Sequence, residues 1–502
     1  MNRIFFALVV VAFLTAAGRQ LAFDFRLWEP EQNVAAALAA APGDELHVVG
    51  FLVAGDAAST TLRGADGATI TLNCASPPGT QRGDAIEVTG TAAPGAVDAC
   101  TASAWVGPMQ AVTAALFDSV KAAVLSVVLP LIGAMAFFLG VMKVAEKGGT
   151  MLVMAKLVRP LMVRLFPDVP PNHPAMSAMI LNIAANALGL GNAATPFGLR
   201  AMQELDRLNP EKGTATNAMA LFLAINTSSI TLLATGAMTM RASLGSTDPA
   251  GVIPTTLFAT VCSTVVAISS CKILERFVPG PRGEVDAEVL AEQAEGDSGA
   301  YPAWASALAL LTLLAAIPLS VVYGAVVGAW IVPIIVTGFI GWGWWKGVAV
   351  YDAFIEGAKE GFDIAVRIIP YLVAILGTVG MLRGSGAIDA FKTVISPLTA
   401  PLGMPAEAVP MVLLRPLSGS GASGLMVETM KEYGPDSYIG YLVSTMQGSS
   451  ETTFYVLAVY FGSVGITRIR HAMVPGLLAD LAGAIGAVIA VQLYFSYNGL
   501  WP

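Results

Sequence analysis

The sequence has few charged residues. Of its 502 residues, 12% are Asp, Glu, Lys or Arg and 55% are hydrophobic, whereas about a quarter of a soluble protein is charged. Most of the chain must therefore face an apolar medium, which excludes a soluble protein and predicts a polytopic membrane protein. The formal charge of −8 excludes a nucleic-acid binder held by a basic surface.

Residues that build metal and catalytic sites are also scarce. Three histidines and four cysteines cannot supply several metal sites or a dense disulfide framework. The sequence contains no Walker loop, no Ser-His-Asp arrangement and no set of His and Cys at metal-binding spacing. We therefore expect no enzyme activity, no cofactor and no metal site.

Long apolar runs make up much of the chain. Each is close to the length of about 20 residues that a membrane-crossing helix needs. Uninterrupted runs lie at 4–17, 116–142, 252–273, 303–322, 325–345, 362–382 and 473–495. Other runs, near 174–206, 214–241, 405–431 and 436–461, are interrupted by small polar residues. The first run follows Arg3, so it is either a cleaved signal peptide or a retained anchor.

Residues 24–108 differ from the rest of the chain. They contain short alternating or β-branched stretches separated by Gly and Pro, which predicts a small inserted β-barrel, OB-like in character. Cys74 and Cys100 are its only cysteines, and they are expected to form a disulfide if this domain lies outside the cytoplasm.

The second half of the chain repeats the first. Residues 191–196 align with 419–424, and 226–229 align with 447–450, in the same order. We expect an anchor helix (1–23), an extracytoplasmic β-domain (24–108), a first repeat (109–278), an acidic cytoplasmic linker (279–302), two connecting transmembrane helices (303–350) and a second repeat (351–502).

Basic residues indicate how the repeats are oriented. If 174–206 and 405–431 are re-entrant hairpins and the two broken helices cross, Lys and Arg concentrate on the side of Arg3, as the positive-inside rule requires. This topology has nine crossings and two hairpins, with the N-terminus inside and the β-domain and C-terminus outside. The second repeat then enters the membrane inverted relative to the first. The expected fold class is an all-α polytopic membrane protein of two inverted repeats.

Four polar interruptions, two in each repeat, are the candidate binding elements. Inverted repeats with broken helices are typical of secondary transporters, whose sites lie where the backbone unwinds. Close packing of small residues is the alternative explanation for any single interruption. The candidate substrate-binding residues are Asn186, Asn192, Thr195, Asn226, Thr227, Ser228, Ser229, Arg415, Ser418, Ser420, Ser423, Gln447, Ser449, Ser450 and Glu451.

Three ionisable residues lie in apolar or broken segments of the second repeat. Arg415, Glu451 and Asp480 have neutral counterparts in the first repeat, and such groups are costly inside a membrane. Arg415 forms a structural ion pair with Glu451 or Asp480, or else binds a substrate carboxylate or phosphate. In the second case Glu451 or Asp480 would carry a coupling proton or cation. Half-helix N-termini after each break also favour an anionic group.

Several motifs resemble the spore maturation proteins A and B. Residues 189–198 (GLGNAATPFG) and 224–232 (AINTSSITL) resemble the A protein, and 414–421 (LRPLSGSG) and 444–449 (STMQGS) resemble the B protein. The chain is therefore similar to the two joined, within the group that carries nucleoside-recognition or gate domains. The resemblance implies a protein of the bacterial inner membrane and favours a retained anchor helix. The inserted β-domain departs from the family pattern.

These observations lead to alternative functions. The favoured one is a secondary transporter or exporter that moves a small polar solute, in one version anionic or nucleoside-like, by alternating access. The second is a non-transporting scaffold or envelope maturation factor whose β-domain recruits a protein partner. The third is a lipid-carrier flippase. The expected partners are a small solute and the lipid bilayer, with no nucleic acid, and the sequence is compatible with a homo-oligomer.

Overall fold

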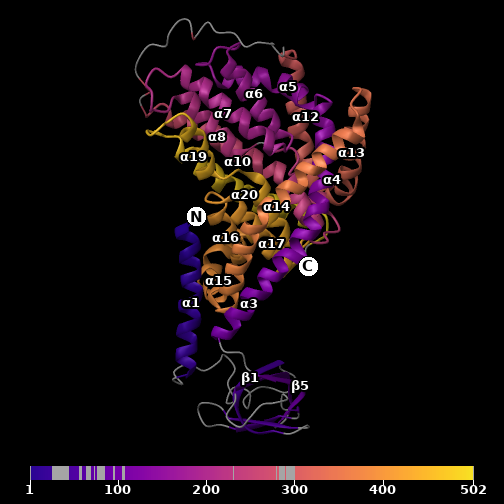
Figure 1. The fold of residues 1–502 in the computed structure, drawn as a ribbon, viewed down its shortest axis with the longest axis vertical. Coiled ribbons are helices and arrows are strands. Elements are labelled where there is room, and N and C mark those ends of the chain that lie inside the picture. The colour runs from indigo at the N-terminus through magenta and orange to yellow at the C-terminus, as the bar shows by residue number, and fades with distance from the viewer. Residues whose placement is uncertain are drawn as a thin grey trace. The chain divides into compact units, whose positions relative to one another are not determined.

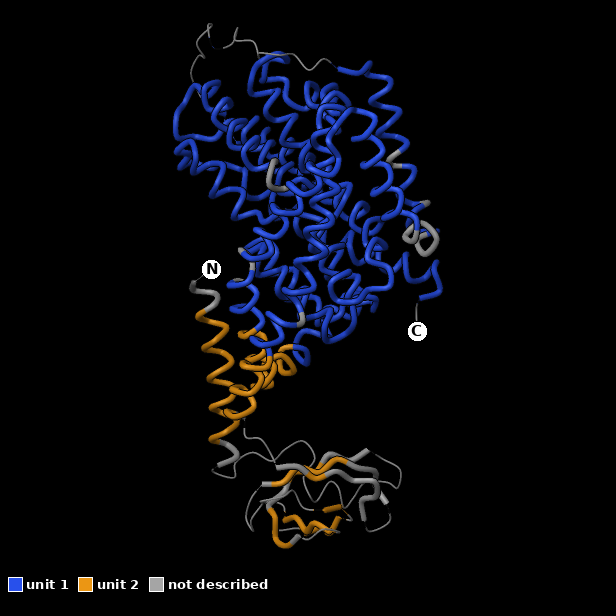
Figure 2. The backbone as a smooth tube through the Cα atoms, turned by 45° about the vertical axis from the view of Figure 1, so that its right-hand side comes forward, with its two compact units in different colours: residues 1, 119–376, 392–502 blue, residues 2–118, 377–391 orange. Residues whose placement is uncertain are grey.

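The computed structural model is mostly helical, with one small sheet near the N-terminus (Figure 1). It describes residues 2–24, 45–55, 59–63, 69–72, 74–75, 85–93, 96–104, 108–229, 231–278, 280–281, 289 and 300–500. Most of the predicted acidic linker, 279–302, lies outside these residues. The chain divides into two compact units (Figure 2): residues 1, 119–376 and 392–502 in the first, and 2–118 and 377–391 in the second.

The second unit contains the first helix, α1 (Asn2–Asp24), and the sheet. Arg19 Nη1 donates to the carbonyl of Ser385 at 2.9 Å, so α1 binds the turn that follows α14 (Val350–Gly384). The strands are β1 (Glu45–Gly55), β2 (Thr60–Arg63), β3 (Thr69–Leu72), β4 (Ala85–Ala93) and β5 (Ala96–Ala104).

The sheet confirms the predicted β-structure but does not show a barrel. All pairings are antiparallel, in the order β3-β2-β1-β4-β5. Among the described strands β3 and β5 stand at the two ends of this order, with no hydrogen-bonded closure between them. Alternate residues such as Val48, Leu62 and Ile86 form its buried core. Cys74 is disulfide-bonded; the side chain of Cys100 lies outside the described part, so its pairing with Cys74 stays a prediction.

The chain after the sheet contains two series of helices in the same order, most of them in the first unit. The first series is α3 (Pro108–Ala122), a π-helical turn (Ala123–Val128), α4 (Leu129–Lys147), α5 (Thr150–Leu165), α6 (Pro174–Ala187), α7 (Gly191–Arg207), α8 (Asn217–Ser228), α9 (Thr235–Ser243) and α10 (Val252–Leu274). The second is α14, α15 (Ala387–Thr399), α16 (Val409–Leu414), α17 (Gly419–Tyr433), α18 (Tyr438–Ser449), α19 (Thr453–Ser463) and α20 (Met473–Tyr497). Helices α12 (Ala303–Val322) and α13 (Gly324–Trp345) separate them.

Helix length and composition support fewer crossings than the nine predicted. In the described part of the chain, four helical segments are long and apolar enough to span a membrane, and a fifth forms if a bent pair counts as one span. The four are Met109–Lys147, Pro249–Leu274, Ala303–Val322 and Met473–Tyr497, and the bent pair is Leu372–Gly384 with Ala387–Leu402. The apolar parts of α1 and α13 are shorter, and the broken helices are each split in two. The nine-crossing topology therefore stays a prediction.

Helix α15 was not anticipated from the sequence. It directly precedes the second hairpin, as α5 precedes the first. The apolar run expected at 362–382 ends before this helix, and no element is expected at 383–404. The run continues in α14 to Gly384, and a turn at Ser385 and Gly386 then bends the chain into α15. The angle between the two segments is 81°.

Helices α4 and α14 pack closely because α14 presents glycines four residues apart. A Cβ atom on Gly361 would lie 2.7 Å from the carbonyl oxygen of Met135, and one on Gly357 would overlap the carbonyl oxygen of Leu139. Lys143 completes this contact with an ion pair to Glu360 at 2.9 Å. Small residues at this spacing allow two backbones to approach, as at many helix interfaces in membranes.

Gly361→Val should destabilise the protein. The added side chain meets main-chain atoms of α4, which cannot move without displacing the helix, so we expect a loss of about 1 to 3 kcal/mol. Thermal unfolding of the purified protein measures it. Gly462→Val in α19 is the matched control, because a Cβ atom there meets nothing within 4 Å. Equal unfolding temperatures for the two variants would contradict the packing described.

Candidate functional site

Polar contacts stabilise the interruption of the broken helix in the first repeat. Helix α8 ends at Ser228, and Ser229 takes a left-handed backbone conformation with φ of 36°. The hydroxyl of Thr260 on α10 lies 3.0 and 2.6 Å from the carbonyl oxygens of Ser228 and Ser229, which share its single hydrogen. Thr260 thus provides a hydrogen-bond donor for carbonyls at the end of α8. In an uninterrupted helix, the N–H groups of the next turn would bind these carbonyls.

The breaks of the two repeats touch. Helix α18 ends at Ser449 and α19 begins at Thr453, and within this break the N–H of Glu451 donates to the carbonyl of Thr227 at 2.7 Å. Each break also binds the hairpin of its own repeat. Leu232 N donates to Ala187 O at 2.9 Å, and Phe454 N donates to Pro416 O at 3.1 Å. Four interruptions that are distant in sequence therefore meet at one place.

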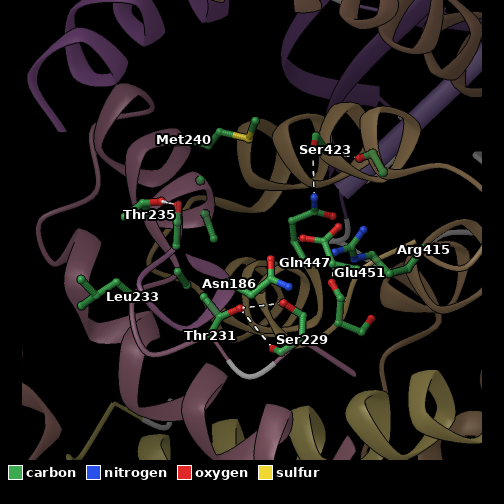
Figure 3. A pocket seen from close by; sticks show the side chains of 17 residues that line it. Asn186, Ser229, Thr231, Leu233, Thr235, Met240, Arg415, Ser423, Gln447 and Glu451 are labelled. Carbon is green, nitrogen blue, oxygen red and sulfur yellow. Dashed lines mark hydrogen bonds between the residues drawn. The ribbon is translucent and has the colours of Figure 1, made fainter. Parts of the chain in front are cut away.

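A cavity of about 360 Å³ lies at this meeting point (Figure 3). Both repeats line it, and its wall is rich in hydroxyl and amide groups. In Figure 3 Thr235 and Leu233 lie on one side, Arg415, Glu451 and Gln447 on the other, and Asn186 and Thr231 between them. The lining residues are Asn186, Gly189, Ser229, Thr231, Leu233, Ala234, Thr235, Gly236, Ala237, Met240, Arg415, Gly419, Ser423, Gln447, Gly448, Ser450 and Glu451.

Two side-chain amides are fixed at the wall, one from each repeat. Asn186 Nδ2 donates to Asn226 Oδ1 at 3.1 Å and so joins the first hairpin to the first broken helix. Gln447 Nε2 donates to Ser423 Oγ at 2.9 Å and joins the second broken helix to the second hairpin. The two repeats thus use the same kind of contact at corresponding places.

Arg415 does not form either of the ion pairs considered from the sequence. Its side chain is 7% exposed, and its terminal nitrogens donate to the carbonyl of Ser450 and to Thr452 Oγ1. Among the described residues, neither Glu451 nor Asp480 lies within ion-pair distance of it. Asp480 instead accepts a hydrogen bond from Thr453 Oγ1. Arg415 therefore bridges the second hairpin and the second break.

Seven of the candidate side chains line the cavity: Asn186, Ser229, Arg415, Ser423, Gln447, Ser450 and Glu451. Others support the wall from behind. Asn226 holds Asn186, Ser228 and Ser449 donate to carbonyls of their own helices, and Ser418 caps α17 by accepting from Gly421 N. Thr227 contributes its carbonyl to the contact with Glu451 N. The candidates Thr195, Ser420 and Asp480 are not among the lining residues.

Asn192 lies in α7, but its side chain is outside the described part. Thr231 and Thr235 also line the cavity but are not among the residues predicted from the sequence. Their signal was weak, because they follow the Asn-Thr-Ser-Ser motif in a stretch that reads as apolar.

A polar cluster joins the repeats beyond one end of the broken helices. We name it the Asp436 cluster, and its centre is Arg241 at the end of α9, which is 0% exposed. Arg241 Nη2 donates to Asp436 Oδ1 at 2.9 Å, and its guanidinium lies 3.9 Å from the ring centroid of Tyr441. Asp248 accepts hydrogen bonds from Tyr441 and Tyr494 at 3.2 and 3.1 Å. Arg241 and Asp248 come from the first repeat and the others from the second.

A second cluster joins the repeats through main-chain contacts. We name it the Arg470 cluster, and it connects the loop before α8 with the loop before α20. Thr467 N and Arg468 N both donate to Gly213 O at 3.0 Å. Arg470 Nη1 donates to the carbonyl of Ala215 and to Asn217 Oδ1, both at 2.9 Å. Each repeat therefore contributes one loop to each cluster.

The Asp436 cluster should make stability depend on pH. Burial raises the pKa of the Asp436 carboxyl, but hydrogen bonds from Ser246 and Thr247 and the charge of Arg241 outweigh this and hold that pKa below its ordinary value. The folded state therefore favours the charged carboxylate. Its contribution is complete above the ordinary pKa of about 3.9 and is lost as the pH falls through the lower folded value.

Asp436→Asn should lower the unfolding temperature at neutral pH. The decrease of the unfolding temperature below about pH 5 should also be smaller in the variant than in the unmodified protein. Thermal unfolding at a series of pH values measures both effects. The control is Asp168→Asn, an exposed carboxyl for which no comparable contact is present in the described structure. An unchanged pH profile in Asp436→Asn would contradict the assigned role.

Comparisons with known proteins agree with the resemblance found in the sequence. The family model described as "Gate: Nucleoside recognition" matches residues 128–244 and 365–467. Spore maturation protein B of Bacillus subtilis is 48% identical over 164 residues, 33% of this chain and 92% of that protein. Spore maturation protein A of the same organism is 39% identical over 171 residues, 34% of this chain and 85% of that protein.

A further relative is inner membrane protein YjiG of Escherichia coli K12, which is 34% identical over 77 residues, 15% of this chain and 50% of that protein. No solved structure matches. The matches to proteins A and B each span most of a relative's length, and the gate model matches once in each of the two helix series. The chain is a membrane protein that belongs to the spore maturation protein A and B family and carries the nucleoside-recognition gate domain twice.

Proposed function

We propose that the protein is a secondary transporter that moves a small polar solute across the bacterial inner membrane by alternating access. The observation that carries the proposal is the contact between the two breaks, Glu451 N to Thr227 O at 2.7 Å, beside a polar cavity lined from both repeats. Unwound backbone is tolerated at membrane depth where it is buried in protein or lines a cavity. Such interruptions hold the solute in transporters built from repeats.

The contacts at the two clusters support an inverted arrangement of the repeats. The first broken helix begins at the Arg470 cluster with Asn217 and ends at the Asp436 cluster with Arg241. The second begins just after Asp436, and the residues that follow it, Thr467 and Arg468, belong to the Arg470 cluster. The two broken helices thus run in opposite directions between the same two clusters. That is the relation expected of repeats with inverted topology.

This arrangement gives the cavity two closures of different chemistry. The Asp436 cluster joins the repeats by a buried cation, a carboxylate and phenolic hydroxyls, whereas the Arg470 cluster joins them by main-chain hydrogen bonds and one guanidinium. Opening one cluster while the other stays closed would expose the cavity to one side of the membrane. Alternation between the two would move a solute without a continuous pore.

Coupling to a proton or cation is assigned to Glu451 and Asp480. Glu451 is an exposed carboxylate at the cavity wall, and Asp480 lies behind it on α20, bound to Thr453 of the same break. An ionisable group in a membrane segment is costly and is usually retained for a function. The N-terminus is placed inside, and the β-domain and C-terminus outside, on the distribution of basic residues.

A cysteine at the cavity tests alternating access without knowledge of the solute. With Cys262 and Cys271 replaced by Ala, Thr235→Cys should react with a membrane-impermeant thiol reagent from either side of sealed vesicles. Thr312→Cys on α12 is the control and should not react, because it faces the lipid in this arrangement. Labelling of Thr235→Cys from one side alone would exclude alternating access and leave a one-sided binding site.

The sheet favours a second candidate function. Transport requires no such domain, and disulfide-bonded Cys74 indicates an oxidising compartment outside the cytoplasm. A scaffold that recruits a protein partner there would use this domain. Deletion of residues 30–106 should then abolish the protein's effect on the envelope while two-sided labelling at Thr235 persists. If the effect on the envelope persists after the deletion, the scaffold function is excluded.

A further inference from the structure

We propose that the transported solute carries a positively charged nitrogen group, such as a protonated amine, which binds between Glu451 and Gln447. The inference rests on the proposed transport function and names the class of solute. It replaces the anionic solute that Arg415 and the half-helix N-termini suggest in the sequence, and it leaves the coupling role to Asp480, because Glu451 binds the solute. The argument depends on which hydrogen-bonding groups at the cavity wall are already used and which are not.

Glu451 offers an unused carboxylate. Its main-chain N–H binds Thr227 O, but within the described part of the chain its side chain forms no ion pair and no hydrogen bond. The side chain is exposed and lines the cavity. A carboxylate has only acceptor sites, so it requires a donor or a cation from the ligand or from water.

Gln447 offers an unused acceptor whose orientation is determined. The hydroxyl of Ser423 donates its single hydrogen to Gly419 O at 3.0 Å. Ser423 Oγ can therefore only accept from Gln447, at 2.9 Å, which requires the amide nitrogen of Gln447 to face it. The amide oxygen is consequently on the other side, where it is buried and without a partner among the described residues.

Arg415 is already engaged with the protein. Both of its terminal nitrogens donate to groups of the second break, Ser450 O and Thr452 Oγ1. These bonds use two of its five N–H groups, and Nε is buried without a partner among the described residues. The guanidinium therefore positions the wall that carries Glu451.

The balance of charge at the breaks agrees with a cationic ligand. Glu451 and Asp480 are the two acidic groups that interact electrostatically with Arg415. With all three side chains ionised, the formal sum is −1. The facing wall from the first repeat is uncharged, with Asn186, Ser229, Thr231 and Thr235 as its polar groups. The lining itself holds one cation, Arg415, and one anion, Glu451. The further negative charge belongs to Asp480 outside the lining, and a net negative surrounding favours a cation.

The test uses four solutes of the same chain length that differ in charge: putrescine, γ-aminobutyrate, butanediol and succinate. Thermal unfolding of the purified full chain is followed as each is titrated at neutral pH, because a ligand of the folded state stabilises it by an amount that grows with the logarithm of one plus the ratio of free ligand concentration to Kd. Putrescine should stabilise most, γ-aminobutyrate less, and the diol and succinate least. Glu451→Gln should weaken the apparent affinity for the amines about tenfold or more.

Two further variants keep the test decisive. Ser423→Ala removes the group that orients the Gln447 amide and should weaken amine binding less than Glu451→Gln does. Glu204→Gln, at a partly buried position of α7 paired with Arg207 and outside the cavity lining, should leave it unchanged. The unfolding temperature of each variant without ligand shows whether it is folded.

Three outcomes would overturn the inference. These are stabilisation by succinate in preference to putrescine, amine binding unchanged in Glu451→Gln, and no stabilisation by either amine. Each leaves two-sided labelling at Thr235 intact, so failure of the solute class is distinguishable from failure of the transport proposal.

Discussion

The site depends on one constraint: a main chain that leaves its helical hydrogen bonds inside a membrane protein must find other partners. In each break of this protein, groups from other segments of the chain form hydrogen bonds with the main-chain groups that lack helical partners. Thr260 serves the carbonyls that end α8, Arg415 serves the carbonyl of Ser450, and Thr227 accepts from Glu451. Because these partners come from neighbouring elements and from the other repeat, the breaks can exist only where those elements meet. The need for these hydrogen-bond partners therefore determines where the cavity lies.

The two repeats join hairpin and broken helix with partly different groups. Both hairpins bind their broken helices through a neutral contact, Asn186 with Asn226 and Ser423 with Gln447. The second hairpin adds the guanidinium of Arg415. The positive charge of Arg415 must be balanced inside the protein. Glu451 and Asp480 lie close enough to interact with it electrostatically. The charged residues of the cavity wall, Arg415 and Glu451, therefore both come from the second series of helices.

Much of the fold follows from sequence pattern, because apolar runs and internal repetition are local signals. The polar interruptions were predicted, and seven of the candidate side chains line one cavity. The rest could not be predicted, since it depends on contacts between distant segments. Whether Ser228 faces the cavity or its own helix, and whether Arg415 meets a carboxylate or a carbonyl, is decided by how α8, α17 and α18 pack. Helix α15 was missed because its separation from α14 is a short turn within an apolar run.

The exchange of loops between repeats has a consequence for assembly. Neither repeat can complete the Asp436 cluster or the Arg470 cluster alone, since each cluster takes one loop from each. If the halves were separate polypeptides, as the two Bacillus subtilis relatives are, they would have to find each other in the bilayer, and dilution would disfavour their pairing. Within one chain the encounter is intramolecular, so the partners are always present at equal numbers and at high effective concentration. Fusion thereby makes formation of the cavity independent of expression level.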